Sequence, residues 1–153
     1  MFNFHSTAEL IFGNETSLNS SKQIIDKLGK NIFVITDKGL TELGLLEPTI
    51  KKLKMNSNVS IFNDVESDPS KNTLLKGVEE AKEFKTTGVL GFGGGSSMDV
   101  AKLVSLLLGS NQNIETIWGV NNAVGPRLPL ALIPTTAGTG SEVTPISIIT
   151  MDD

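Results

Sequence analysis

Short apolar runs alternate with helical patterns along most of this chain, and the alternation limits the possible folds more than any other feature. The runs "NIFVITD" (31–37), "VSIFNDV" (59–65) and "GVLGFG" (88–93) are typical of strands that are buried on both faces of a sheet. Apolar residues recur at helical spacing between these runs. Strands joined by helices form βαβ units with right-handed crossovers, so the sequence predicts an α/β fold, a parallel sheet with helices on both faces.

Other segments are predicted from local signals. Residues 2–12 mix aromatic and polar side chains before Gly13, which suits an edge strand or a hairpin. Asp68 followed by Pro69 is typical of the N-cap and first turn of a helix. The segment 98–108 is almost wholly apolar, so its helix must be buried. Further helices are expected over 14–28 and 47–54, and a last strand over 146–151.

Length and composition indicate one compact domain, residues 1–153. The net charge is −4, and the sequence shows no cluster of Lys and Arg that could bind a nucleic-acid backbone. Any bound phosphate must therefore be held mainly by backbone N–H groups. The chain has no cysteine, its first residues lack the pattern of a signal peptide, and its longest apolar stretch is too short to span a bilayer. We expect a cytoplasmic protein without nucleic-acid or membrane partners.

The stretch "GFGGGSSMDVAK" (91–102) places four glycines between a strand and a helix. Glycine lets backbone approach a ligand closely, and a helix N-terminus offers free N–H groups to an anion such as a pyrophosphate. A tight turn would explain one or two of these glycines, but not four. The pattern meets neither the G-x-G-x-x-G fingerprint nor the phosphate loop, because Lys102 lies deep in the helix.

Asp37 stands at the end of the first predicted strand. A carboxylate there can accept hydrogen bonds from both hydroxyls of an adenosine ribose and would repel a 2′-phosphate, which favours NAD over NADP. The alternative is that Asp37 caps the following turn, "DKGL". Position alone does not decide between the two interpretations.

The segment "IPTTAGTGSEVTP" (133–145) combines a strand end with alternating small and hydroxyl-bearing residues. Thr135, Thr136 and Thr139 can donate hydrogen bonds to phosphate or ribose oxygens, although a plain Ser/Thr-rich turn would share this composition. The carboxyl ends of parallel strands lie along one edge of a sheet. We therefore expect this segment, Asp37 and the glycines to lie on the same rim.

The motifs "VITDKGL", "GFGGGSSMDVAK" and "IPTTAGTGSEVTP", in this order and spacing, resemble the N-terminal half of the iron-containing (group III) alcohol dehydrogenases. The resemblance covers essentially the whole chain. It implies a Rossmann-like, dehydroquinate synthase-like domain that binds NAD, and a separate helical domain beyond this chain that carries iron or another divalent metal.

The resemblance also implies roles for single residues. Asp37 would hold the adenosine ribose, and Asp99 would lie near the nicotinamide end. The remaining residues would contact the pyrophosphate or line the phosphate and ribose path: Gly94, Gly95, Ser96, Thr135, Thr136 and Thr139.

The metal of the family is held by one aspartate and three histidines, whereas this chain has one histidine, His5. We therefore expect no metal ligand and no catalytic residue within the chain, and no turnover by the chain alone. The whole enzyme would transfer hydride between an alcohol and NAD, giving an aldehyde or ketone. The alternatives are a non-catalytic nucleotide-binding module and the cofactor domain of a glycerol dehydrogenase-like enzyme.

The expected partner is a small-molecule alcohol or aldehyde. An isolated half would also expose the apolar face that meets the missing domain, and such a patch promotes association. A homo-oligomer is therefore expected.

Overall fold

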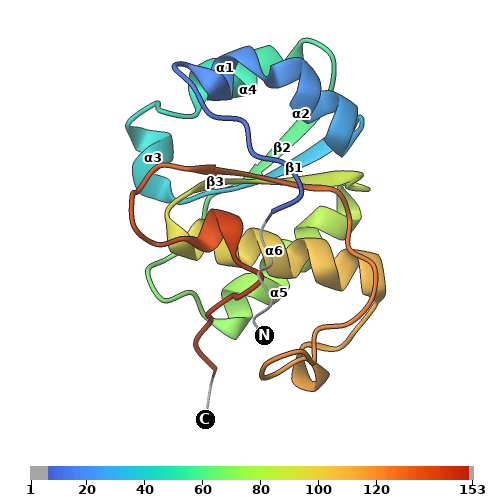
Figure 1. Ribbon diagram of the computed structural model, residues 1–153. Coiled ribbons are helices and arrows are strands. Elements are labelled where there is room, and N and C mark those ends of the chain that lie inside the picture. The colour runs from blue at the N-terminus through green and yellow to red at the C-terminus, as the bar shows by residue number, and fades with distance from the viewer. Residues whose placement is uncertain (1–6, 152–153) are drawn as a thin grey trace.

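The computed structural model describes residues 7–151, and in this range four parallel strands form one sheet (Figure 1). Their order across the sheet is β2-β1-β3-β4. The strands are β1 (Asn31–Ile35), β2 (Asn58–Phe62), β3 (Gly88–Gly93) and β4 (Leu130–Pro134). The predicted α/β fold with a parallel sheet is confirmed.

Helices cover both faces of the sheet, as the alternating pattern predicts (Figure 1). The helices α1 (Thr16–Asn19), α2 (Ser21–Leu28) and α4 (Glu47–Lys54) lie on one face. The helices α5 (Lys71–Glu83) and α6 (Gly95–Ser110) lie on the other. Three short elements complete the chain: α3 (Lys38–Glu42), η1 (Ile114–Thr116) and η2 (Ser141–Val143).

Each face of the sheet carries its own core, because successive strand residues point to opposite sides. Phe33 and Ile35 of β1 pack with α5 and α6, whereas Ile32 and Val34 pack with α2 and α4. All four side chains are completely buried. Burial of a side chain of this size stabilises a fold by about 1.5–3 kcal/mol. Strand β1 therefore contributes to the stability of both cores.

The helix predicted over 98–108 is part of α6, and it is buried as expected. Met98, Val100, Ala101 and Val104 have no exposed surface and lie against the sheet or α5. Within residues 7–151, no helix combines the length and the apolar character that crossing a bilayer requires.

The sequence prediction was wrong at the start of α5. The N-cap is Ser70, whose side chain accepts a hydrogen bond from the Thr73 N–H, and the helix begins at Lys71. Asp68 instead adopts a left-handed backbone conformation, with φ of 53°. The chain turns at Asp68 because the backbone N–H of Ser70 is bound by the carboxylate of Glu66, four residues earlier.

Three other predictions concern the first and last segments of the chain. Residues 7–12 form no strand, and residues 2–6 of the predicted edge strand lie outside the described range. The predicted last strand, 146–151, joins the sheet nowhere, and Thr150 makes only an isolated bridge to Ser70. The helix expected over 14–28 is divided at Ser20 into α1 and α2.

Two buried glycines, Gly88 at the start of β3 and Gly77 inside α5, allow a sharp test of this packing. A Cβ on Gly88 would lie 2.5 Å from the backbone oxygen of Leu28, whereas a Cβ on Gly77 in α5 would meet the ring of Phe62 at an ordinary 3.5 Å. We expect Gly88→Ala to lower the free energy of unfolding by about 1–3 kcal/mol. Gly77→Ala should raise it by about 0.5–1 kcal/mol, because alanine favours helix.

Urea unfolding of both variants measures these differences. Equal stability of the two variants would contradict the close contact between Gly88 and the end of α2.

Candidate functional site

The strand order creates a switch point between β1 and β3. The chain passes from β1 to β2 on one side and then crosses to β3 on the other side. In open parallel sheets of this kind, ligands bind beyond the carboxyl ends of the strands at the switch. Asp37 follows β1 there and Gly94 follows β3. We call this edge of the sheet, with the segment after β4, the rim.

The N-terminus of α6 opens directly onto the rim. Gly94 is its N-cap, and no side chain caps the helix. The residues on either side, Gly93 and Ser97, are buried, whereas 94–96 are partly exposed. The first N–H groups of a helix have no partners within it and carry a partial positive charge, so an anion can bind them.

The four glycines of the motif divide into two pairs. A Cβ on Gly91 would lie 2.8 Å from the Cβ of Ala101 in α6, and one on Gly93 would lie 2.7 Å from the hydroxyl of Ser97. These two glycines therefore allow α6 to pack closely on β3. Gly94 and Gly95 make no such tight contact and face the other predicted motif instead.

The space beside Gly94 and Gly95 is bounded by threonines. A Cβ on Gly94 would lie 3.6 Å from Thr136, and one on Gly95 would lie 3.4 Å from Thr139. Both threonines are exposed. We call the space between these four residues the cradle. One wall lacks side chains, and the other carries threonines, whose hydroxyl oxygens would lie 3.6 Å (Thr136) and 3.9 Å (Thr139) from the added Cβ atoms.

The segment that carries the threonines is fastened at its start. The backbone N–H of Thr135 donates to the carbonyl of Gly93 at 2.9 Å, which continues the pairing of β3 with β4. Further along, Gly138 and Gly140 have φ of +100° and +68°, and a Cβ on either would meet no atom within 4 Å. The backbone therefore makes a turn at these two glycines, and the space beside each of them is open.

Asp37 caps α3, which is the alternative that the sequence left open. Its Oδ1 accepts a hydrogen bond from the backbone N–H of Leu40 at 2.9 Å. The cap uses one carboxylate oxygen and fixes the direction of the group, while the residue is only partly buried. Capping and ribose binding are therefore compatible. The cap uses Oδ1 and orients the carboxylate, while Oδ2 takes no part in the cap.

Asp99 differs from the other seven predicted site residues, because it is buried while they are at least partly exposed. Its Oδ1 accepts from the hydroxyl of Ser141 and lies 2.9 Å from Nζ of Lys102. Its Oδ2 accepts from the backbone N–H of Ile148 at 3.0 Å. Asp99 thus lies beneath the segment after β4 and is engaged by protein groups. Helical spacing predicts the position of Lys102 inside α6, but it does not predict these contacts with the segment after β4.

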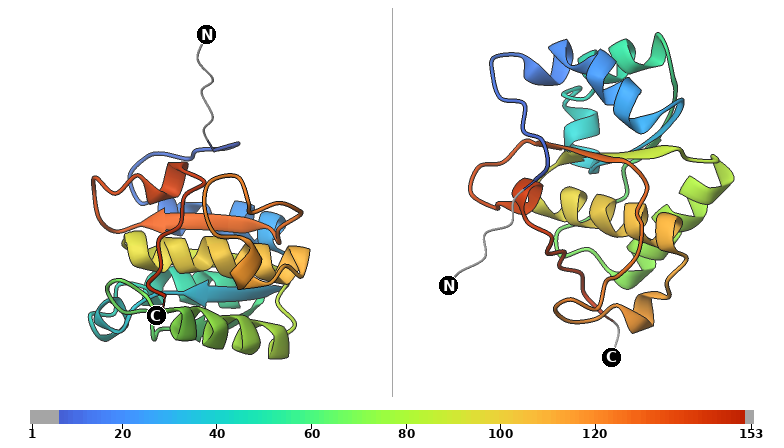
Figure 2. Two further views of the ribbon diagram at one scale, coloured as in Figure 1. Left: turned by 90° about the horizontal axis from the view of Figure 1, so that it is seen from below. Right: turned by 45° about the vertical axis from the view of Figure 1, so that its right-hand side comes forward.

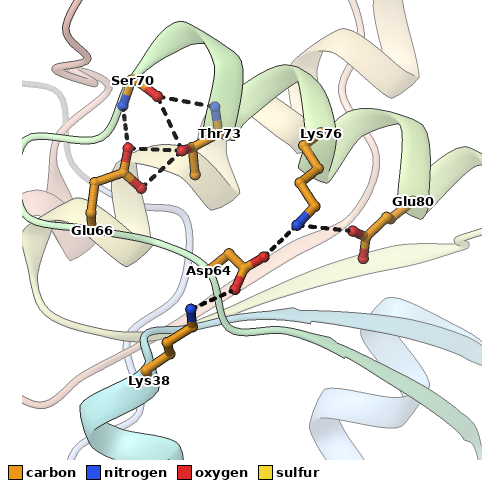
Figure 3. A network of polar contacts seen from close by, with 7 residues as sticks. All are labelled: Lys38, Asp64, Glu66, Ser70, Thr73, Lys76 and Glu80. Atoms are coloured by element: carbon orange, nitrogen blue, oxygen red, sulfur yellow. Dashed lines mark hydrogen bonds and ion pairs between the residues drawn. The ribbon is translucent and has the colours of Figure 1, made fainter.

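A charged network lies beyond the end of β2 (Figure 3). Asp64 accepts a hydrogen bond from Lys76 of α5 and lies 3.3 Å from Nζ of Lys38. These two lysines hold the pKa of Asp64 below its usual value. Lys38 directly follows Asp37, so the network connects α3 to α5 beside the rim.

Glu66 forms the second part of this network (Figure 3). Its carboxylate accepts from the backbone N–H of Ser70 at 2.9 Å and from the hydroxyl of Thr73 at 2.7 Å. Burial acts to raise the pKa of Glu66, but the hydrogen bonds from Ser70 and Thr73 outweigh it and lower the pKa overall. The ionised carboxylate therefore stabilises the first turn of α5.

The rim is accessible, because residues 94–96 are partly exposed and residues 135–139 are exposed. A hollow found elsewhere, between α2 and α4, is lined by residues such as Lys22, Asp26 and Lys52 and shares none with the rim.

The described residues do not fit a metal centre. Between residues 7 and 151, no group of three or more His, Cys, Asp or Glu side chains lies close enough to hold an ion. His5 is outside that range. We derive no metal-dependent step from this part of the chain.

Comparison with known proteins identifies one family. The family described as "Iron-containing alcohol dehydrogenase" matches residues 7–153. A sulfoacetaldehyde reductase of Bilophila wadsworthia is 32% identical over 97% of this chain and 38% of its own length. Long-chain-alcohol dehydrogenase 1 of Geobacillus thermodenitrificans is 38% identical over 84% of this chain and 34% of its own.

A solved structure agrees with the sequence relatives. The sulfoacetaldehyde reductase of Bifidobacterium kashiwanohense in complex with NAD⁺ is 28% identical, with a TM-score of 0.85 over 99% of this chain and 40% of that one. The chain thus spans 34% to 40% of the length of these three proteins and corresponds to their N-terminal part.

The Glu66 contacts generate a pH-dependent prediction. A carboxyl whose pKa is lowered by folding contributes stability above its ordinary value of 4.5, and this contribution is lost as the pH falls through the lowered pKa. We expect Glu66→Gln to reduce the free energy of unfolding near neutral pH by up to about 1 kcal/mol, allowing for solvent screening.

The difference from the native chain should shrink at a low pH that lies below the lowered pKa, where Glu66 is protonated in the folded chain. Urea unfolding at the two pH values measures it, with Glu79→Gln on the exposed side of α5 as the control. A difference that is the same at both pH values would contradict the role of the ionised carboxylate.

Proposed function

Because the chain belongs to the iron-containing alcohol dehydrogenase family, we propose that residues 1–153 are the dinucleotide-binding domain of an alcohol dehydrogenase and that the rim binds NAD. The observation that carries the proposal is the cradle. It lies at the uncapped N-terminus of α6, beside the switch point between β1 and β3.

The cradle receives the pyrophosphate of the dinucleotide. The backbone N–H groups of Gly95 and Ser96 supply donors from the first turn of α6, and the hydroxyls of Thr136 and Thr139 supply donors from the opposite wall. Gly94 has no side chain, so the phosphate oxygens can approach the backbone closely. This arrangement uses backbone donors and a helix dipole, which suits a chain of net charge −4.

Asp37 selects the cofactor. Its carboxylate, oriented by the Leu40 N–H, accepts hydrogen bonds from the adenosine ribose and repels a 2′-phosphate. NAD is therefore the preferred dinucleotide. The relative that was solved with NAD⁺ supports this choice.

The whole protein transfers hydride between an alcohol and the cofactor, giving an aldehyde or a ketone. Bound NAD supplies the hydride acceptor, and the residues of this chain bind and orient it. That the chain alone does not turn over stays a prediction. The substrate is a small alcohol or aldehyde. The homo-oligomer and the cytoplasmic location stay predictions.

Cofactor choice is tested by calorimetric titration of the chain with NAD and NADP. We expect tighter binding of NAD, and we expect Asp37→Asn to weaken NAD about ten-fold or more, because a charged acceptor is lost. Asparagine also caps helices, so α3 stays in place. Asp26→Asn on α2 is the control. Equal affinity for NAD and NADP, or no effect of Asp37→Asn, would contradict the role of Asp37.

The cradle is tested separately with Gly94→Ala. Gly94 has φ of −77° and a Cβ there would lie 3.6 Å from Thr136, so alanine fits the empty chain and stability should change by less than about 0.5 kcal/mol. The methyl group nevertheless occupies space that the pyrophosphate needs, so NAD affinity should fall about ten-fold or more. Unchanged affinity in a stable variant would mean that no phosphate binds here.

A further inference from the structure

Two charged side chains are buried in the apolar helix α6. Asp99 and Lys102 lie one turn apart, and their carboxylate and ammonium groups are 2.9 Å apart. Only 12% and 11% of the two side chains is exposed. Burial of an ion pair is unfavourable unless further hydrogen bonds satisfy both groups. The positions of these further bonds therefore indicate what the pair does.

All the further bonds of this pair run to one segment, residues 141–148. Asp99 accepts from the hydroxyl of Ser141 and from the backbone N–H of Ile148. Lys102 donates to the carbonyls of Ser141 at 3.0 Å, Thr144 at 3.4 Å and Ile146. We call this set of contacts the latch. Figure 2 shows the segment, in red, passing across α6.

The latch adjoins the cradle. Ser141 is the residue where the latch begins, and its backbone N–H lies 3.4 Å from the hydroxyl oxygen of Thr139. The other end of the threonine segment is held by the bond from Thr135 to Gly93. Residues 135–141 are thus fastened at both ends, and the part between includes the flexible Gly138 and Gly140.

We propose that Asp99 and Lys102 are positioning residues, which hold the threonine wall of the cradle opposite the N-terminus of α6 without touching the dinucleotide. The inference rests on the proposed function, since it concerns the same cradle. It assigns to Asp99 a role different from the contact near the nicotinamide that the family resemblance implies.

The physical reason lies in the glycines of the threonine segment. A loop with two glycines samples many conformations unless other contacts restrict it. If only a fraction of the molecules hold the wall in place, the apparent dissociation constant rises by the inverse of that fraction. The latch orders the wall before the ligand arrives.

The test compares Asp99→Asn, Lys102→Met and the double variant with the native chain. Amide hydrogen exchange measures the order of residues 135–148. Calorimetry measures binding of NAD and of ADP-ribose, which lacks the nicotinamide. The matched controls are Glu79→Gln and Lys82→Met, because Glu79 and Lys82 form an exposed ion pair with the same spacing on α5.

We expect each single latch variant to speed exchange in 135–148 but not in β3. NAD and ADP-ribose should both weaken by the same factor, about ten-fold if a tenth of the molecules keep the wall in place. The double variant should be no weaker than the worse single variant, because it leaves no unpaired buried charge. The control variants should change neither exchange nor binding.

Several outcomes overturn the proposal. If Asp99→Asn weakens NAD but not ADP-ribose and leaves exchange unchanged, Asp99 contacts the nicotinamide end directly. If neither latch variant changes exchange in 135–148, the pair does not order the wall, whether or not the chain binds NAD.

If the native chain binds neither ligand, the proposed function fails and the positioning role fails with it, while exchange still shows whether the latch orders the segment. Should Asp99→Asn not fold, Ser141→Ala removes the hydroxyl contact with Asp99 and leaves the ion pair in place. Lys102→Arg should preserve the order and affinity that Lys102→Met loses.

Discussion

The close packing of α6 on β3 is the constraint on which the rest of this structure depends. It is possible because Gly91 has no side chain, since a Cβ there would lie 2.8 Å from Ala101. The packing directs the N-terminus of α6 onto the rim and brings Gly94 and Gly95 opposite the threonines. Another face of α6 carries Asp99, which lies beneath the segment after β4 and binds it. The contact between Gly91 and Ala101 therefore supports both the packing of the fold and the position of the candidate site.

Most of the sheet could be predicted from sequence, because strands buried on both faces are marked by continuous apolar runs. The 88–93 run became β3 with the same bounds, and the helix over 47–54 became α4. The start of α5 could not be predicted in the same way. The pair Asp68 and Pro69 is a sound local signal, but Glu66 binds the backbone at Ser70 and moves the cap two residues along the chain.

The predicted strand over 146–151 failed for a related reason. Its alternating apolar residues fit a strand, but its backbone groups are taken by side chains of another element. Lys102 binds the carbonyl of Ile146, and Asp99 binds the N–H of Ile148. Contacts of this range are invisible to periodicity. The signal available in the sequence was an acid and a lysine three residues apart in an otherwise apolar helix, where two buried charges require partners.

The positions of the candidate residues are predicted best where backbone geometry decides them, whereas their binding roles stay predictions. Glycines between a strand and a helix leave few alternatives, and they lie at the switch point as expected. Asp37 shows why a single carboxylate is harder to interpret, since the same group caps α3 and stays accessible at the rim. Every group of the cradle and of the latch lies between β3 and residue 148, and each is held by contacts inside that range. The geometry that we propose for the pyrophosphate therefore rests on contacts within this range. Because the test of that geometry is ligand affinity, it can be carried out by calorimetry without a measurement of turnover.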